Sequence, residues 1–131
     1  MDLTKTFTFD MAHRLSFHKG KCQNLHGHTY KLEVTISGDA DENGMVIDFN
    51  DMANICMEEV VDVLDHATVI YEKDELMMNS FPMELHHVIM PYEPTAENLC
   101  LWISDRLEKG GLKIKQVAIW ETASSKALYI K

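Results

Sequence analysis

The chain has 131 residues, a formal net charge of −9 and a hydrophobic fraction of 46%. This is enough apolar material for one core, so we expect a single domain over residues 1–131. The acidic balance argues against a nucleic-acid partner. No apolar run approaches the roughly 20 residues of a membrane span, and the start lacks a signal-peptide pattern. Three widely spaced cysteines argue for reduced thiols, and we therefore expect a cytoplasmic protein without a membrane partner.

Two stretches near the start of the chain alternate between apolar and polar residues, as half-buried β-strands do. In residues 3–13, Phe9, Met11 and His13 share one face, and residues 29–37 alternate in the same way. The turn-rich sequence GDADENG follows, and then the short apolar run MVIDF. Together these features predict an antiparallel hairpin meander.

Two helices are expected in the remainder. Asn50 or Asp51 would cap the first helix. Its apolar stripe would consist of Ala53, Cys56, Val60 and Leu64. Pro94-Thr95 would open the second helix and Gly110-Gly111 would end it. Leu99, Ile103 and Leu107 would form its apolar side.

Strands are also expected at residues 113–121 and 127–130, with a possible short strand at residues 85–90. The resulting order predicts an α+β domain in which both helices cover one face of an antiparallel sheet. Edge strands of such a small sheet favour pairing with other subunits. The pattern is least informative over residues 67–94.

The distribution of charge is uneven. No Asp or Glu occurs from Met11 to Leu32, and the same stretch holds four of the seven histidines together with Arg14, Lys19, Lys21 and Lys31. A locally basic segment in an acidic protein indicates a pocket for an anionic ligand. A short window can also lack acidic residues by chance.

The densest chemical signal is the sequence Cys22-Gln-Asn-Leu-His26-Gly-His28. Residues i and i+2 of a strand point to the same face, so His26 and His28 can present two imidazoles side by side. His13, at the end of the preceding strand, can supply a third. Three neutral imidazoles with an open fourth position suit a catalytic zinc ion, whereas structural sites are usually closed by four ligands. The alternative is a set of ordinary surface or packed histidines.

Cys22 lies in an expected loop among lysines. The basic neighbours and a metal would favour its thiolate, so it is a candidate ligand, nucleophile or base. Cys56 and Cys100 instead fall at helical core positions, where an inert buried thiol is expected.

Two further carboxylates lie near potential partners. Asp65-His66 follows the first helix, and a carboxylate beside an imidazole can form a general-base pair, although adjacent residues need not touch. Glu121 follows an apolar strand, where its carboxylate can accept two hydrogen bonds from the amino-N–C–NH edge of a heterocycle. Alternatively, Glu121 marks a strand end that reaches water.

Several short motifs, taken together, identify a family that the chain resembles. They are Phe9-Asp-Met-Ala-His13-Arg, Cys22-x-x-x-His26-Gly-His28, Val46-Ile-Asp-Phe49, Leu64-Asp-His66, Pro94-Thr-Ala-Glu-Asn98 and Trp120-Glu-Thr122. In this order and over nearly the whole chain, they resemble the 6-pyruvoyltetrahydropterin and 6-carboxytetrahydropterin synthase family.

The resemblance implies the tunnelling fold, with a four-stranded antiparallel sheet and two helices, and assembly into an oligomeric barrel. The implied oligomer is commonly a hexamer made of two trimers. The resemblance implies one zinc ion per chain on His13, His26 and His28. Cys22 is implied as the proton-abstracting residue, and Asp65-His66 as its catalytic partners. Glu121 would anchor the pterin ring near Thr95, and adjoining subunits would share each site.

The three-residue spacing between Cys22 and the HGH motif resembles the bacterial carboxy enzymes of queuosine and deazapurine synthesis. They convert 7,8-dihydroneopterin triphosphate into 6-carboxytetrahydropterin, acetaldehyde and triphosphate. The alternatives are a 6-pyruvoyltetrahydropterin-forming enzyme and a non-catalytic, zinc-containing pterin or purine binder. The run from Ala67 to Tyr92 departs from the family by being longer than in its compact members.

Overall fold

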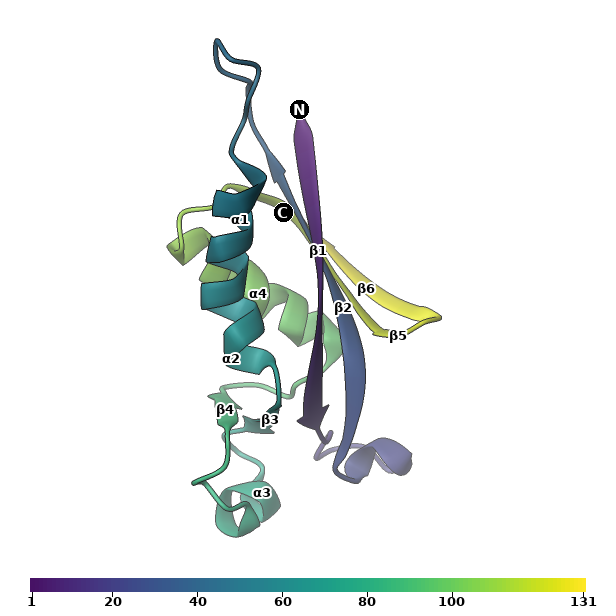
Figure 1. The fold of residues 1–131 in the computed structure, drawn as a ribbon. Helices are drawn as coiled ribbons and strands as arrows, with labels where there is room; N and C mark the ends of the chain where they lie inside the picture. Colours follow the sequence, from purple (N-terminus) through teal and green to yellow (C-terminus); the bar gives the residue numbers. More distant parts are fainter.

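The computed structural model describes residues 1–131, which form a twisted six-stranded sheet with the strand order β4-β3-β1-β2-β5-β6 (Figure 1). The strands are β1 (Asp2–His13), β2 (His26–Ser37), β3 (Ala67–Tyr71), β4 (His87–Met90), β5 (Ile114–Thr122) and β6 (Ser125–Ile130). The pairs β1–β2, β2–β5 and β5–β6 are antiparallel. β3 runs parallel to both β1 and β4.

The predicted four-stranded antiparallel sheet is therefore wrong in strand number and in strand direction. The four antiparallel strands exist, but the segment after the first helix adds two short parallel strands to them. In β3, Ala67, Val69 and Ile70 are all buried, so the strand does not show a simple alternation of buried and exposed residues. Such a short run carries no clear period in the sequence.

The helices lie on one face of the sheet, as predicted (Figure 1). One helical rod consists of α1 (Phe49–Cys56), the π-helical turn η2 (Met57–Val61) and α2 (Asp62–Leu64). The second long helix is α4 (Ala96–Lys109), and a short helix, α3 (Glu75–Ser80), lies between β3 and β4. None of them combines the length and apolar character needed to cross a membrane.

The core fills the space between the long helices and the sheet. On the sheet side, Phe9, Tyr30 and Leu32 are almost fully buried, and Leu99 and Ile103 of α4 pack on the same cluster. The alternation of β1 and β2 and the helical period of α4 place these side chains on facing surfaces.

The start of the first helix differs from the prediction. The run Met45–Phe49 forms no strand and leads directly into α1, whose cap is Asp48 rather than Asn50 or Asp51. The Asp48 carboxylate accepts a hydrogen bond from the backbone N–H of Asn50 at 2.6 Å. Cys56, Val60 and Leu64 of the expected apolar stripe are buried, but at its start Met52 is buried and Ala53 is only partly covered.

The pairing of β1 and β2 positions the candidate site. His13 is the last residue of β1 and lies opposite His26, the first residue of β2. Met11 lies opposite His28. The connection over residues 14–25 contains a single 3-10 turn, η1 (Lys21–Gln23), which carries Cys22. All the residues of the Cys22–His28 motif therefore gather at one end of the sheet.

Candidate metal centre and active site

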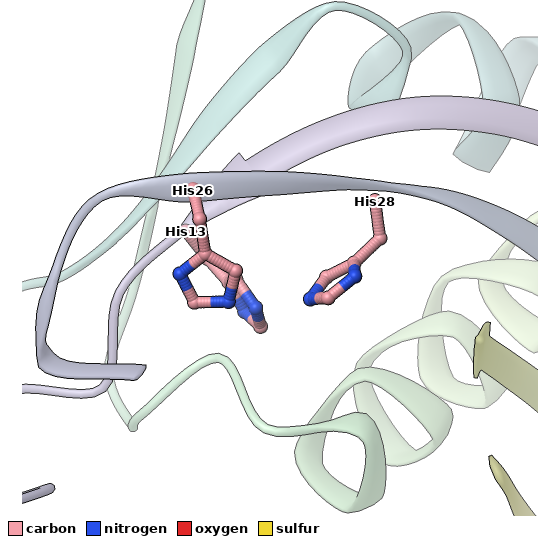
Figure 2. Close-up of side chains that lie close together, drawn as sticks. All are labelled: His13, His26 and His28. Carbon is pink, nitrogen blue, oxygen red and sulfur yellow. The ribbon is translucent and has the colours of Figure 1, made fainter. Parts of the chain in front are cut away.

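Three imidazoles meet at the shared end of β1 and β2. His26 and His28 are two residues apart on one strand, and His13 pairs directly with His26 on the other. Their side chains consequently point to the same face, toward the segment that leads into α4 (Figure 2). One ligand nitrogen from each ring lies within 4.8 Å of the other two, close enough for one metal ion. The geometry confirms that the three predicted histidines cluster.

Backbone carbonyls orient two of the rings. The Nδ1 atom of His13 donates to the carbonyl of Pro94 at 2.7 Å, and Nδ1 of His26 donates to the carbonyl of Asn24 at 2.7 Å. Because a carbonyl can only accept, each Nδ1 carries the proton and each Nε2 keeps a free lone pair. This arrangement is common for histidines that bind metals through Nε2.

The environment of His13 favours its neutral ring. His13 is 1% exposed, and its burial lowers its pKa by disfavouring the charged imidazolium. The Nε2 atom of His28 is buried without a hydrogen-bond partner. Buried nitrogens are normally paired, so this orphaned atom fits a role as a metal ligand. Three imidazoles that approach one point suit a divalent transition metal.

Tyr30 lies two residues after His28 on β2, and its side chain points to the same face of the sheet as those of His26 and His28. Its hydroxyl lies 3.3 Å from Nε2 of His13, and burial raises the pKa of the phenol, which therefore stays protonated. In the sequence, Tyr30 is marked only by the alternation of residues 29–37. The i, i+2 spacing that places His26 and His28 on one face of the strand also predicts that Tyr30 lies on that face.

Glu121 and Thr95 lie beside this cluster. Oε1 of Glu121 is 3.6 Å from Nε2 of His28, because β5 pairs with β2. Glu121 and Thr95 line the same surface pocket, together with Leu15, Phe17 and Lys126. The structure thus brings both predicted substrate-binding residues to the metal end of the sheet. Thr95 also caps α4 by accepting a hydrogen bond from the N–H of Asn98 at 3.2 Å.

The three cysteines divide as the sequence predicts. Cys22 is half-buried in the connection between the two histidine-bearing strands, and its carbonyl accepts a hydrogen bond from Leu15 at 2.8 Å. Cys56 and Cys100 are buried in the core, and burial raises the pKa of each thiol to about 11. A protonated, buried thiol is a poor nucleophile, so only Cys22 is suited to chemistry.

Asp65 and His66 do form a pair. Oδ2 of Asp65 lies 3.0 Å from Nδ1 of His66. The other carboxylate oxygen accepts a hydrogen bond from the backbone N–H of Asp10 at 2.9 Å. The hydrogen bond from the Asp10 backbone has the largest effect and lowers the pKa of Asp65. The hydrogen bond with the side chain of His66 lowers this pKa further. His66 adopts φ 60, and its side chain is 76% exposed.

The pair lies on the opposite side of the sheet from the three imidazoles. His66 lines a hollow with Asp10, Thr29 and Thr68. Along β1 and β2, Asp10 and Thr29 alternate with the core-facing residues, so they point away from the face that carries the histidines. A single chain therefore does not bring Asp65-His66 together with the metal cluster.

Comparison with known proteins places this arrangement in a family. Residues 2–131 match the family model of 6-pyruvoyl tetrahydropterin synthase, and the chain belongs to this family. A 6-carboxy-5,6,7,8-tetrahydropterin synthase of Haemophilus influenzae is 41% identical over 132 residues, covering 94% of each chain. Another, from Aquifex aeolicus, is 34% identical and covers 98% of this chain and 96% of its own.

Solved structures support the fold. The 6-pyruvoyltetrahydropterin synthase of Plasmodium vivax superposes with a TM-score of 0.81, at 23% identity, over 100% of this chain and 97% of its own. The predicted α+β tunnelling fold is confirmed at this level, with the sheet enlarged to six strands.

Proposed function

We propose that the protein is a zinc-dependent 6-carboxy-5,6,7,8-tetrahydropterin synthase acting on 7,8-dihydroneopterin triphosphate. The products would be 6-carboxytetrahydropterin, acetaldehyde and triphosphate, in the synthesis of queuosine and related deazapurines. One observation carries the proposal: Glu121, suited to hold a pterin ring, lies 3.6 Å from an unpaired nitrogen of the three-histidine cluster. Ring anchor and metal site are thus adjacent, and the curated relatives carry this enzyme name.

His13, His26 and His28 would hold one zinc ion. When bound, the zinc would lower the pKa of the hydroxyl groups on the substrate side chain. The orientation of His13 and His26 by the carbonyls of Pro94 and Asn24 keeps their Nε2 atoms available in advance. Such preorganisation lowers the cost of metal binding.

The remaining residues would bind the ring and move protons. Glu121 would accept two hydrogen bonds from the amino-N–C–NH edge, with the Thr95 side of the pocket beside it. Cys22 would take a proton from the side chain, and Asp65-His66 would exchange protons with it as a general acid–base pair. Because the pair faces away from the cluster of its own chain, we assign it to the site of an adjoining subunit.

An oligomer of this kind, proposed as a hexamer made of two trimers, has structural support. β4 and β6 are edge strands with unpaired backbone groups. On β6, Leu128 and Ile130 are 46% and 62% exposed, an apolar surface that a neighbouring subunit can cover.

The test is a product assay. The purified, zinc-loaded protein is incubated with 7,8-dihydroneopterin triphosphate, and the pterin products and acetaldehyde are identified by mass spectrometry. We expect 6-carboxytetrahydropterin and acetaldehyde in equal amounts. A pyruvoyl product without acetaldehyde would support the alternative lyase, whose name the matching family model carries. Tight binding without turnover would instead identify a pterin-binding protein.

A further inference from the structure

The long segment between the two main helices contains a buried charge. Asp74 is 4% exposed and caps the short helix α3, where its Oδ1 accepts a hydrogen bond from the N–H of Met77 at 3.3 Å. Its Oδ2 lies 3.1 Å from Nε of Arg14, whose side chain is only 14% exposed. Arg14 directly follows His13. The ion pair therefore joins the added segment to the connection that begins at the metal cluster.

A second carboxylate holds the same connection two residues later. Both the N–H and the hydroxyl of Ser16 donate to the carboxylate of Glu93, the N–H at 3.1 Å. The carbonyl of Glu93 in turn accepts hydrogen bonds from Thr95 and Asn98, each at 2.9 Å. These contacts fix Glu93 to the start of α4.

Leu15, between the two anchored residues, contacts the backbone of Cys22. Its N–H donates to the Cys22 carbonyl at 2.8 Å, and its own carbonyl accepts from the N–H of His18 at 3.1 Å. Three consecutive residues thus make different contacts. The side chain of Arg14 pairs with Asp74, and Ser16 donates hydrogen bonds to Glu93. Leu15, between them, binds the backbone of the turn that carries Cys22.

We propose that Asp74 and Glu93 are positioning residues, which fix Arg14 and Ser16 so that the turn carrying the thiol of Cys22 is held in one place on the connection between the two histidine-bearing strands. The inference rests on the proposed function, in which Cys22 moves a proton. It gives the segment over residues 67–92 a role, because that segment supplies Asp74. Neither carboxylate needs to touch the substrate.

Physical reasoning favours a kinetic role over a purely stabilising one. Breaking a buried ion pair leaves the remaining charge uncompensated, so Arg14 would move toward water and carry its neighbour Leu15 with it. A shift of about 1 Å at a reacting group can cost on the order of a hundredfold in rate. Leu15 is one of the residues lining the pterin pocket, but the proposed ring anchor Glu121 and the three imidazoles would be left in place.

The test uses variants that change little else. Asp74→Asn keeps an oxygen that can cap α3 but removes the charge that faces Arg14. Ser16→Ala removes one of the two hydrogen bonds to Glu93, and Ser16→Thr restores a hydroxyl. Glu75→Gln, an exposed carboxylate of the same helix, is the matched control.

Two measurements are made on the zinc-loaded full-length protein. The first is the rate at which iodoacetamide alkylates Cys22, followed by peptide mass spectrometry, with buried Cys56 and Cys100 as internal references. The second is the separation of kcat from KM with 7,8-dihydroneopterin triphosphate. Zinc content is determined for each variant.

For Asp74→Asn and Ser16→Ala we expect Cys22 alkylation to become at least about threefold faster and kcat to fall by roughly tenfold to a hundredfold. KM and zinc content should stay within about twofold of the wild type, because the ring anchor Glu121 and the three metal ligands are unchanged. Ser16→Thr should recover most of the rate, and Glu75→Gln should match the wild type.

The proposal is overturned if both variants alkylate and turn over like the wild type, even if they melt at a lower temperature. Cys22→Ala separates this failure from that of the proposed function. An inactive Cys22→Ala beside fully active Asp74→Asn and Ser16→Ala would refute only the positioning role. A fully active Cys22→Ala would refute the catalytic role of the thiol, and alkylation rates would then decide whether the carboxylates hold it.

Discussion

The three-histidine cluster and the Asp65-His66 pair differ in every physical respect. His13 is 1% exposed, whereas the side chain of His66 is 76% exposed. The cluster faces the helices, and His66 of the pair lines a hollow with Asp10 and Thr29, whose side chains point to the other side of the sheet. Strand pairing assembles the first group within one chain, while the second lacks anything in its own chain to act upon. The difference is consistent with the proposed oligomer, in which each chain would supply these two parts to different sites.

The causes of this difference are local. His26 and His28 need only the period of a strand, and His13 only the register of a neighbouring strand. His66 instead follows a helix end, in a left-handed conformation, with its N–H bound to the carbonyl of Asp10 at 2.6 Å. Substitutions in the three-histidine cluster should therefore leave the Asp65-His66 pair unaltered, and substitutions in the pair should leave the cluster unaltered.

Removing a metal ligand should have the largest effect. His26→Ala leaves two imidazoles and an unsatisfied site, so we expect zinc to fall from about one ion per chain to nearly none, with complete loss of turnover. Elemental analysis of protein purified without chelator measures this. His18→Ala, in the same connection but outside the cluster, should retain the metal. Wild-type protein without any metal would contradict the prediction.

Removing the thiol should abolish chemistry but not metal binding. Cys22→Ala should turn over roughly a hundredfold to ten-thousandfold more slowly, the usual cost of losing a general acid or base. Its zinc content and pterin affinity should equal those of the wild type. Single-turnover rates and metal analysis provide the comparison. Loss of zinc would show that Cys22 is a fourth ligand and that the centre is closed.

Mixing two inactive variants tests whether the two parts meet across subunits. Cys22→Ala and His66→Ala are each expected to be nearly inactive. After joint unfolding and reassembly in equal amounts, about a quarter of shared sites should combine an intact thiol with an intact histidine. A comparable fraction of wild-type turnover should return. Reassembly of each variant alone is the control, and no recovery in the mixture would indicate that each site is built from one chain.

Much of the fold could be predicted because it depends on local signals. Thr95 and Gly110 mark the ends of α4, and the alternation of residues 3–13 describes nearly all of β1. β3 could not be predicted, since its five residues, Ala-Thr-Val-Ile-Tyr, are too few to show a clear period and its place depends on pairing with β1. The cap at Asp48 was missed because two neighbouring polar residues also fit the cap pattern.

In the candidate site, too, local sequence patterns predict some features, whereas others depend on contacts between distant residues. The spacing of His26 and His28 predicts their proximity, and His13 follows from strand pairing. The hydrogen bond from His13 to the Pro94 carbonyl joins residues 81 positions apart and uses a backbone atom, which no side-chain pattern reveals. Arg14 and Asp74 are likewise distant in sequence and carry no recognisable motif. Contacts of this kind appear only once the chain is folded.

Loss of the ring anchor should have an intermediate effect. Glu121→Ala removes the carboxylate that lines the pocket, and hydrogen bonds to charged groups contribute about 1.5–3 kcal/mol each. We expect substrate binding to weaken roughly tenfold to a hundredfold, with zinc retained. Titration with the substrate or a non-reactive pterin measures this. Glu97→Ala, an exposed carboxylate lining the same pocket, is the control, and equal losses in both variants would argue against a specific anchor.

Thr95 offers the smallest and most discriminating test, because the structure gives it a second role. Its hydroxyl caps α4, and loss of such a cap costs about 1 kcal/mol of stability. Thr95→Ala should lower the free energy of unfolding by that amount, while Thr95→Ser should leave it nearly unchanged. If Thr95 also contacts the pterin, Thr95→Ala should weaken binding at temperatures where the protein is fully folded, and Thr95→Ser should restore it. Denaturant unfolding and pterin titration on the same samples separate the two effects. A stability loss with unaltered binding would leave Thr95 as a helix cap only, and Glu121 as the sole ring contact proposed in this pocket.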